Sequence, residues 1–262
     1  MDILSHLSPA YPWKDTIHIY ETIDSTNTRA KELAAQGAPH GTVLIARQQT
    51  AGRGRMGRSF FSPKDAGLYL SIILRPQCTP TELMHLTCAT AVAACDAVED
   101  ATGFRPNIKW INDLVWGSRK LGGILTELSV TPGSCKVDYA IIGIGINCDK
   151  TAYPQELAEI ALSLQEVTGR TVSPDLLAAK LLERLCRMDG MLLTEKDAIL
   201  ASYRKNCVTL GKAVTVHSAQ GVYEATALDI DSEGALLVQT KDGNTQAVSS
   251  GEVSVRGMYG YA

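Results

Sequence analysis

The stretch Gly52-Arg53-Gly54-Arg55-Met56-Gly57-Arg58 places three arginines among three glycines, and no acidic side chain occurs between Arg47 and Lys64. Guanidinium groups are rarely buried without anionic partners, so this segment is a loop and not part of the core. Glycine lets the backbone approach a ligand closely, and arginine offers a planar set of donors to carboxylate or phosphate. A solvated flexible loop is the alternative, but the composition favours an anion-binding loop.

The spacing Gly52-x-Gly54-x-x-Gly57 also matches the dinucleotide-binding pattern, which requires a helix directly after the glycines. Here the residues up to Lys64 have no helical pattern, and the apolar run Leu68–Leu74 predicts a strand. Arginines also occupy positions that the packing of a helix on a strand would need to be small or apolar. The sequence therefore excludes a Rossmann fold and predicts that the loop joins two strands.

Apolar runs alternate with helix signals as far as residue 206, and short β runs separated by Gly, Asp and Asn follow Gly211. This change predicts a large domain over residues 1–208 and a small C-terminal β-barrel over residues 209–262. The large domain is predicted to be α+β, with a mixed or antiparallel sheet packed against helices. Its expected strands lie at 16–20, 43–46, 68–74, 108–110, 114–116, 121–130 and 137–146, with a turn at 131–134, and its expected helices lie at 29–35, 80–101, 174–193 and 196–206.

The composition is that of a globular protein, because 45% of the 262 residues are hydrophobic and 20% are charged. A net charge of −3 argues against general electrostatic binding of nucleic acid. The sequence contains neither a signal peptide nor the run of about 20 apolar residues that spans a membrane. The seven cysteines include no Cys-x-x-Cys pair, which indicates free thiols in a reducing compartment and hence a cytoplasmic protein.

Three further polar clusters are candidate binding residues. Lys109-Trp110-Ile111-Asn112-Asp113 is either a simple hairpin turn or a cation, an amide and a carboxylate that together hold a polyphosphate and its metal ion. Lys120 precedes Gly122-Gly123, so it is either a solvated turn residue or a cation that a ligand can approach closely. Ser25-Thr26-Asn27 either caps a helix or hydrogen-bonds a neutral heterocycle.

In this order, the clusters resemble the motifs of the biotin–protein ligases, and the resemblance extends from about residue 17 to the end of the chain. The loop motif and the Lys-Trp-x-Asn-Asp motif are the specific ones. The matching segments are Asp24-Ser25-Thr26-Asn27, Gln49-x-x-Gly52-Arg53-Gly54-Arg55-x-Gly57-Arg58, Lys109-Trp110-x-Asn112-Asp113, Arg119-Lys120-x-x-Gly123 and Ile142-Gly143-x-Gly145-x-Asn147.

The resemblance implies a catalytic domain similar to those of class II synthetases and a reaction in two steps. The carboxylate of biotin attacks the α-phosphorus of MgATP, which gives biotinyl-5′-AMP and pyrophosphate. A lysine of a biotin carboxyl carrier protein or domain then takes the biotinyl group and releases AMP. Biotin is thus a substrate, ATP a co-substrate and Mg²⁺ the accompanying metal ion, in a protein expected to be a monomer or homodimer.

The resemblance also assigns residues to the site. Lys120, Arg53 and Arg55 are the implied catalytic cations, and Asp113 is the candidate metal ligand. The residues implied for biotin are Ser25, Thr26, Asn27, Gln49, Gly52, Arg53, Gly54, Arg55, Lys120 and Gly123. The residues implied for ATP and the adenylate are Arg55, Arg58, Lys109, Trp110, Asn112, Asp113 and Asn147.

The sequence departs from the family pattern at Ile111, where proline is usual, and at Met56, where arginine is common. Only fifteen residues precede the first expected strand, too few for the DNA-binding module of some members, so we expect a ligase without a role on DNA. One alternative is a lipoate–protein ligase or an octanoyltransferase, for which Cys148 is the only cysteine beside a proposed site residue. The other alternative is a biotin sensor without catalytic activity.

Overall fold

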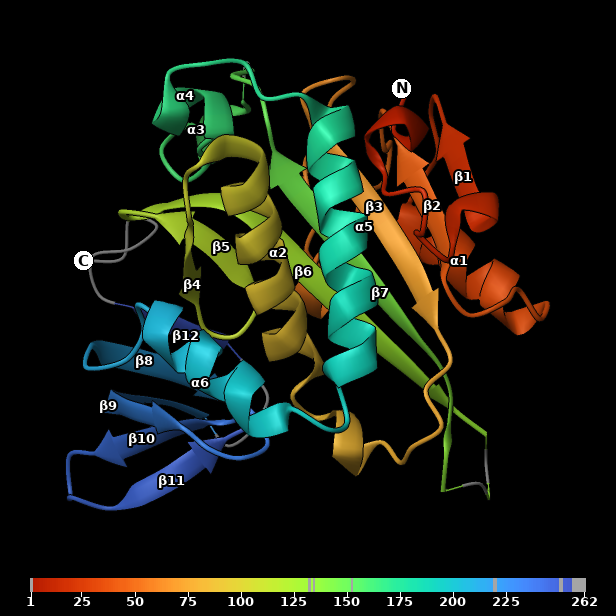
Figure 1. Ribbon diagram of the computed structural model, residues 1–262. Helices are drawn as coiled ribbons and strands as arrows, with labels where there is room; N and C mark the ends of the chain where they lie inside the picture. Colours follow the sequence, from red (N-terminus) through yellow and green to blue (C-terminus); the bar gives the residue numbers. More distant parts are fainter. Residues whose placement is uncertain are drawn as a thin grey trace.

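The computed structural model describes residues 2–131, 133, 135–151, 153–218, 221–249 and 252–255. Its centre is a seven-stranded sheet in the order β1-β2-β3-β7-β6-β5-β4 (Figure 1). β1 and β2 are parallel and the other neighbouring pairs are antiparallel, so the sheet is mixed, as predicted. The strands are β1 (Ile17–Tyr20), β2 (Thr42–Ala46), β3 (Gly67–Leu74), β4 (Asn107–Lys109), β5 (Asp113–Trp116), β6 (Arg119–Val130) and β7 (Val137–Asn147).

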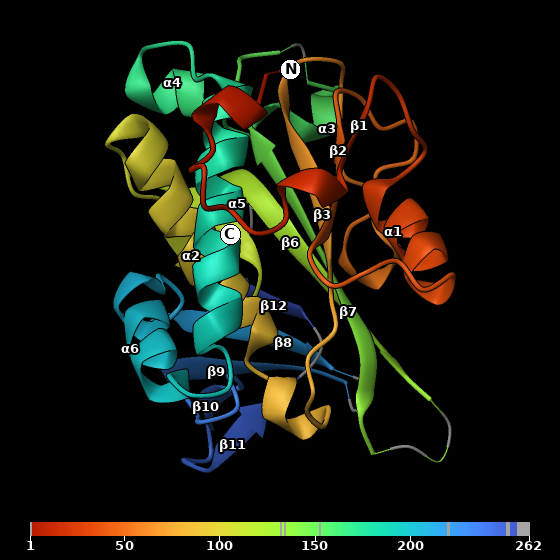
Figure 2. The ribbon, with the colours of Figure 1, turned by 45° about the vertical axis from the view of Figure 1, so that its right-hand side comes forward.

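Helices cover both faces of this sheet, because successive side chains along a strand point to opposite faces. Leu44 and Ile73 are buried against α1 (Thr26–Ala35) on one face. Their neighbours in sequence belong to the main core on the other face, which α2 (Leu86–Thr102) and α5 (Pro174–Met191) cover. Figures 1 and 2 show α2 and α5 side by side against the sheet, with α1 on the far side.

The helices start and end near the predicted positions, with differences that have local causes. α1 begins earlier than expected because the Ser25 side chain caps it by accepting from the Thr28 amide. The expected helix at 80–101 is divided into a short 3-10 turn and α2. The remaining helical segments are α3 (Gln155–Ala158), α4 (Leu164–Thr168), α6 (Lys196–Asn206) and the 3-10 turns Leu4–His6, Lys14–Thr16, Arg55–Gly57 and Thr81–Leu83.

The C-terminal strands form the expected small antiparallel β domain, a five-stranded sheet in the order β11-β10-β9-β8-β12 that is open, and not a closed barrel, in the residues that the structure describes. The buried side chains of this sheet, among them Val214, Val216 and Val238, belong to the main hydrophobic core of the chain. The strands are β8 (Ala213–Ser218), β9 (Gly221–Ile230), β10 (Leu236–Thr240), β11 (Thr245–Val248) and β12 (Glu252–Val255).

Two predicted features lie partly outside the described residues. They are positions 132 and 134 of the expected turn and positions 256–262 at the end of the expected C-terminal domain. Among the helices of the described ranges, none is both long enough and apolar enough to cross a membrane.

The C-terminal sheet is tied to the segment that carries the Lys-Trp-x-Asn-Asp motif. The backbone amide of Trp110 donates to Thr209 Oγ1 at 2.9 Å, and its indole Nε1 donates to the Gly234 carbonyl at 3.1 Å. The Tyr203 hydroxyl donates to the carbonyl of Ile111, at the position where the resembling family usually has proline. The sheet and α6 therefore hold the turn between β4 and β5 from behind.

We expect Trp110→Phe to lower the free energy of unfolding by about 1–3 kcal/mol, because the Gly234 carbonyl loses its indole donor in a buried place. Denaturant-induced unfolding measures this loss. Trp116→Phe is the matched control, since that side chain is 46% exposed. Equal losses in the two variants would contradict the role of the indole bond.

Candidate active site

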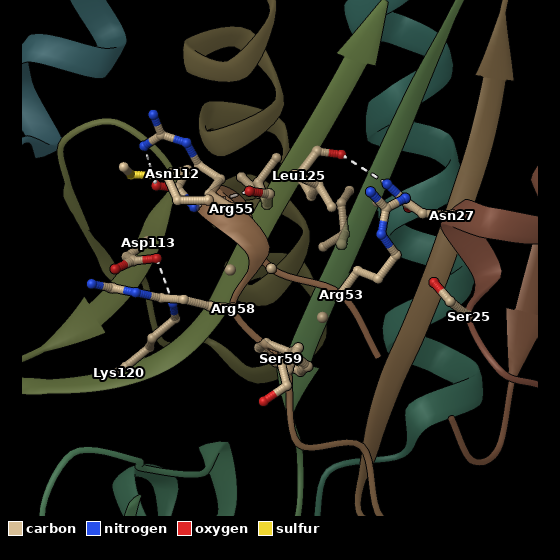
Figure 3. A pocket seen from close by; sticks show the side chains of 18 of the residues that line it. Ser25, Asn27, Arg53, Arg55, Arg58, Ser59, Asn112, Asp113, Lys120 and Leu125 are labelled. Atoms are coloured by element: carbon tan, nitrogen blue, oxygen red, sulfur yellow. Dashed lines mark hydrogen bonds and ion pairs between the residues drawn. The ribbon is translucent and has the colours of Figure 1, made fainter. Parts of the chain in front are cut away.

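The face of the sheet that carries α1 is hollowed into a cavity at the N-terminal end of that helix. Ile141 packs beneath α1, and Gly143 and Gly145 follow at the next positions of β7 on the same face. Two successive glycines leave this part of the face without β7 side chains. The residues that line the cavity are Ser25, Thr26, Asn27, Gln49, Arg53, Gly54, Arg55, Met56, Arg58, Ser59, Phe60, Leu70, Lys109, Trp110, Asn112, Asp113, Lys120, Gly123, Ile124, Leu125, Gly143, Ile144, Gly145 and Val253 (Figure 3).

The residues predicted for the site gather around this cavity, with two exceptions. Gly52 lies at the base of the loop, where an added Cβ would be 2.4 Å from the Phe60 carbonyl oxygen. The Asn147 side chain donates to the Leu162 carbonyl at 3.0 Å, and so fastens the segment before α4 to the end of β7. Both residues therefore support the walls of the cavity from outside its lining.

The Gly/Arg loop (Gly52–Arg58) folds back on itself over the cavity. Arg53 and Ser59 form an antiparallel bridge, and the Gly54 amide donates to the Arg58 carbonyl at 2.7 Å. Met56, at the turn, has a left-handed backbone with a φ of 55°. The loop thus has a definite hairpin shape, which directs its arginine side chains to separate places.

Two arginines of this loop contact opposite ends of the cavity. The Arg53 guanidinium makes two contacts with the Glu127 carboxylate of β6, at 3.1 and 3.2 Å, beside Asn27. The Arg55 guanidinium donates to Asn112 Oδ1 at 3.0 Å, between β4 and β5. Figure 3 shows Arg53 on the Asn27 side and Arg55 on the Asn112 side. The resemblance implied that both arginines act with Lys120 as catalytic cations, whereas in the structure they contact different ends of the cavity.

Lys120 lies at the Asn112 end of the cavity, where its Nζ is 2.6 Å from Asp113 Oδ1. The pairing of β5 with β6 shifts between Leu114–Gly122 and Val115–Lys120, so Leu121 is an extra residue in β6. This irregularity brings the Lys120 side chain to the same face as Gly123. An added Cβ at Gly123 would be 3.2 Å from Lys120 Nζ, so glycine leaves room for the lysine.

The opposite end of the cavity presents uncharged hydrogen-bonding groups, next to the Arg53–Glu127 pair. The Thr26 amide donates to Gln49 Oε1 at 2.9 Å, and the Thr26 hydroxyl lies 3.1 Å from the same oxygen. The side-chain nitrogen of Gln49 donates to Ser62 Oγ. This hydrogen bond leaves the Gln49 side-chain oxygen facing Thr26. Ser25, Thr26 and Asn27 are all buried. This end can bind a small polar ring by hydrogen bonds, while the Lys120 end can bind anions.

The described residues contain no group of three or more His, Cys, Asp or Glu side chains that could hold a metal ion by themselves. Cys148 is buried, and burial raises the pKa of its thiol to about 12. A thiol with this pKa stays protonated at neutral pH and is a poor nucleophile. All seven cysteines are free thiols, as predicted.

Comparison with known proteins agrees with this geometry. The biotin/lipoate A/B protein ligase family matches residues 19–147, and the C-terminal domain of biotin protein ligases matches residues 209–256. A bifunctional ligase/repressor, BirA, of Bacillus spizizenii is 35% identical over 85% of this chain and 69% of its own length. The biotin–[acetyl-CoA-carboxylase] ligase of Mycobacterium tuberculosis is 31% identical over 92% of this chain and 89% of its own length.

Among solved structures, the biotin protein ligase of Aquifex aeolicus in complex with biotin and ATP is similar, with a TM-score of 0.78 and 29% sequence identity. The similarity covers 92% of this chain and 98% of that protein. The fold and the site thus define a protein ligase of the biotin/lipoate class. The chain belongs to the biotin protein ligases within that family.

Several residues at or behind the cavity were not predicted from the sequence. Ser71 is fully buried in a strand whose other residues are apolar. This isolated polar residue could have indicated a position at the site. Glu127 gave a weaker signal, as one acidic residue in the long strand β6. Phe60 lies over β7 because Gly145 has no side chain, since an added Cβ there would be 2.5 Å from the Phe60 ring.

We expect Gly143→Ala to lower the free energy of unfolding by about 1–3 kcal/mol, because its Cβ would lie 1.9 Å from Asn27 Oδ1 in a buried place. Denaturant-induced unfolding measures the loss. Gly190→Ala, in α5, is the matched control because open space surrounds its Cβ. If the Gly143→Ala and Gly190→Ala variants had the same free energy of unfolding, β7 and Asn27 would be able to move apart without loss of stability.

Proposed function

We propose that this protein activates biotin with ATP as biotinyl-5′-AMP and transfers the biotinyl group to a lysine of a biotin carboxyl carrier protein or domain. The observation that carries the proposal is the division of one cavity into a neutral hydrogen-bonding end at Thr26 and Gln49 and a cationic end at Lys120. Biotin has the same division, with an uncharged ureido ring and a carboxylate. The family relationship supports this substrate.

The cationic end provides what the first step needs. A carboxylate and a phosphate are both anions, and two unit charges about 4 Å apart repel by about 4 kcal/mol at an effective dielectric constant of 20. A lysine ammonium has three donors, so Lys120 can keep its contact with Asp113 and still contact both anions. Cations fixed where the biotin carboxylate meets the α-phosphate stabilise the charge that develops on phosphorus.

Mg²⁺ would enter this site bound to ATP and would neutralise phosphate charge there. Asp113 fits this role in the first step, because it is a carboxylate at the cavity wall and Mg²⁺ in such sites takes one or two protein carboxylates together with phosphate oxygens. Lys109 and Asn112 line the cavity next to Asp113 and would face the nucleotide.

The overall reaction is tested by incubating the protein with labelled biotin, MgATP and a biotin carboxyl carrier domain. Label on the carrier lysine supports the ligase. Tight biotin binding without pyrophosphate release would indicate a sensor, and transfer of lipoate or octanoate in place of biotin would indicate the related ligases or transferases. The buried Cys148 thiol disfavours the transferase, because that route needs a thiolate.

Lys120→Ala is expected to slow pyrophosphate release by about a hundredfold or more. The reason is that the cation paired with Asp113 is lost from the place where the carboxylate meets the α-phosphate. Pyrophosphate release under saturating biotin and MgATP measures the effect, and the melting temperature checks the fold. The control is Lys64→Ala, at an exposed lysine near Glu21. Release within twofold of the wild type would remove Lys120 from the first step.

Arg55→Ala is expected to release bound biotinyl-5′-AMP about tenfold to a hundredfold faster, the range for a lost hydrogen bond to a charged group. A chase with unlabelled adenylate measures the release rate. Arg29→Ala, at a surface arginine paired with Glu32, is the control. Identical release from Arg55→Ala and wild type would show that Arg55 does not close the cavity.

The free cysteines support a reducing compartment. That the protein acts in the cytoplasm, as a monomer or homodimer and without a role on DNA, stays a prediction.

A further inference from the structure

Glu127 lies on β6 behind the cavity and accepts four hydrogen bonds from three side chains, which belong to α1 and the Gly/Arg loop. Its Oε1 accepts from Lys31 Nζ at 2.6 Å and from Arg53 Nη2 at 3.1 Å. Its Oε2 accepts from Arg53 Nη1 at 3.2 Å and from Asn27 Nδ2 at 3.1 Å. A carboxylate offers about four lone-pair directions, and all of them are used here. The plane of the carboxylate is therefore fixed.

The cluster keeps Glu127 ionised. Burial raises the pKa of this carboxyl, but hydrogen bonds from Lys31 and Asn27 and the charges of Lys31 and Arg53 outweigh burial and leave the pKa below its ordinary value. The side chain of Glu127 is 18% exposed, compared with 41% for Arg53 and for Lys31. The carboxylate is thus the inner and more rigid partner, on a strand in the middle of the sheet.

From Glu127, a chain of hydrogen bonds leads to the wall of the cavity. Because Nδ2 of Asn27 faces Glu127, its Oδ1 faces Ser71 and accepts from the Ser71 hydroxyl at 2.6 Å. The Ser71 hydroxyl also lies 2.7 Å from Thr26 Oγ1, and the Thr26 hydroxyl donates to Gln49 Oε1 at 3.1 Å, so Ser71 and Gln49 together hold the Thr26 hydroxyl. Thr26 Oγ1 is left with lone pairs toward the cavity, where it can accept from an N–H of a ligand.

Glu127 also determines where the Gly/Arg loop lies. Its pairing with the Arg53 guanidinium draws the first half of the loop to the neutral end of the cavity, beside Asn27 (Figure 3). In this position the Arg53 side chain is directed away from Lys120. In this structure Arg53 therefore contacts Glu127 and not the Lys120 end of the cavity.

We propose that Glu127 is a positioning residue that fixes both the hydrogen-bond acceptor at Thr26 and the closed position of the Gly/Arg loop. The proposal rests on the proposed function for the identity of the ligand, a cyclic urea with N–H donors. Its action on the loop needs no ligand. The two parts can therefore be tested separately.

The first experiment follows the loop without biotin or ATP. Glu127→Gln keeps the size of the side chain but replaces one acceptor oxygen by an amide that faces donors. We expect trypsin to cleave after Arg55 and Arg58 about tenfold faster in this variant, the scale of a lost charge-assisted pair. Asp100→Asn is the matched control, because it removes a two-contact partner from Arg184 far from the cavity. Equal cleavage of Glu127→Gln and wild type, with unchanged melting temperatures, would overturn the role in the loop.

The second experiment measures ligand binding. Glu127→Gln is expected to weaken biotin binding in the absence of ATP by about tenfold, because the orientation of Asn27 and Thr26 is no longer fixed, whereas Asp100→Asn leaves it unchanged. Unchanged biotin affinity would overturn the role at Thr26. If the wild type binds no biotin, the proposed function fails, while the trypsin result still stands.

A double-mutant cycle with Arg53→Ala separates positioning from direct contact. If Arg53 acts through Glu127, the variant with both changes releases biotinyl-5′-AMP no faster than the faster of the single variants. If the two increases in release rate multiply, Arg53 contacts the ligand independently, and its assignment to Glu127 is overturned.

Discussion

The site depends on holding cations at a half-buried cavity, where an unpaired charge would be strongly destabilising. Lys120 is paired with Asp113, and Arg53 is paired with Glu127, before any ligand is present. β6 supplies one member of each pair. Lys120 and Glu127 are seven residues apart, so they would face opposite sides of a regular strand. The extra residue Leu121 changes the alternation and brings both onto the face that carries the cavity.

The space for the ligand comes from the register of the sheet. Gly145 of β7 pairs with Gly123 of β6, and Gly123 pairs in turn with Asp113 of β5. In the next row of the same face, Gly143 pairs with Ser71 of β3. Adjacent glycines in the centre of a sheet remove side chains without interrupting the backbone hydrogen bonds. The cavity is therefore rigid at its floor, and its polar groups come from the strands and turns around the glycines.

The sequence was sufficient to predict the mixed sheet and the four long helices, because these features repeat a local signal over several residues, whereas the short helices α3 and α4 were not predicted. Most of the cavity lining was implied by the resemblance to a known family. The Gly/Arg loop and Lys109–Asp113 are dense polar clusters, and such clusters are visible without a structure. Ser71 and Glu127 are single polar residues in strands, and their importance comes from partners far away in sequence. The direction of Arg53 could not be predicted for the same reason. The small C-terminal β domain was predicted, but its open form was not, because strand patterns do not show whether the two edge strands pair with each other.

The Gly/Arg loop contacts both ends of the cavity through side chains at alternate positions, Arg53 and Arg55. Arg53 and Arg55 are two residues apart, yet one contacts Glu127 beside the neutral end and the other contacts Asn112 beside Lys120. Arg55 begins the hairpin turn, in which Met56 has a left-handed conformation, whereas Arg53 lies before the turn and is bridged to Ser59. Movement of the loop away from either end must break contacts at the other, because the segment is short and internally bonded. Closure is therefore a single event that both ends control, so a ligand that fills both ends stabilises the closed loop more than one that fills either end alone.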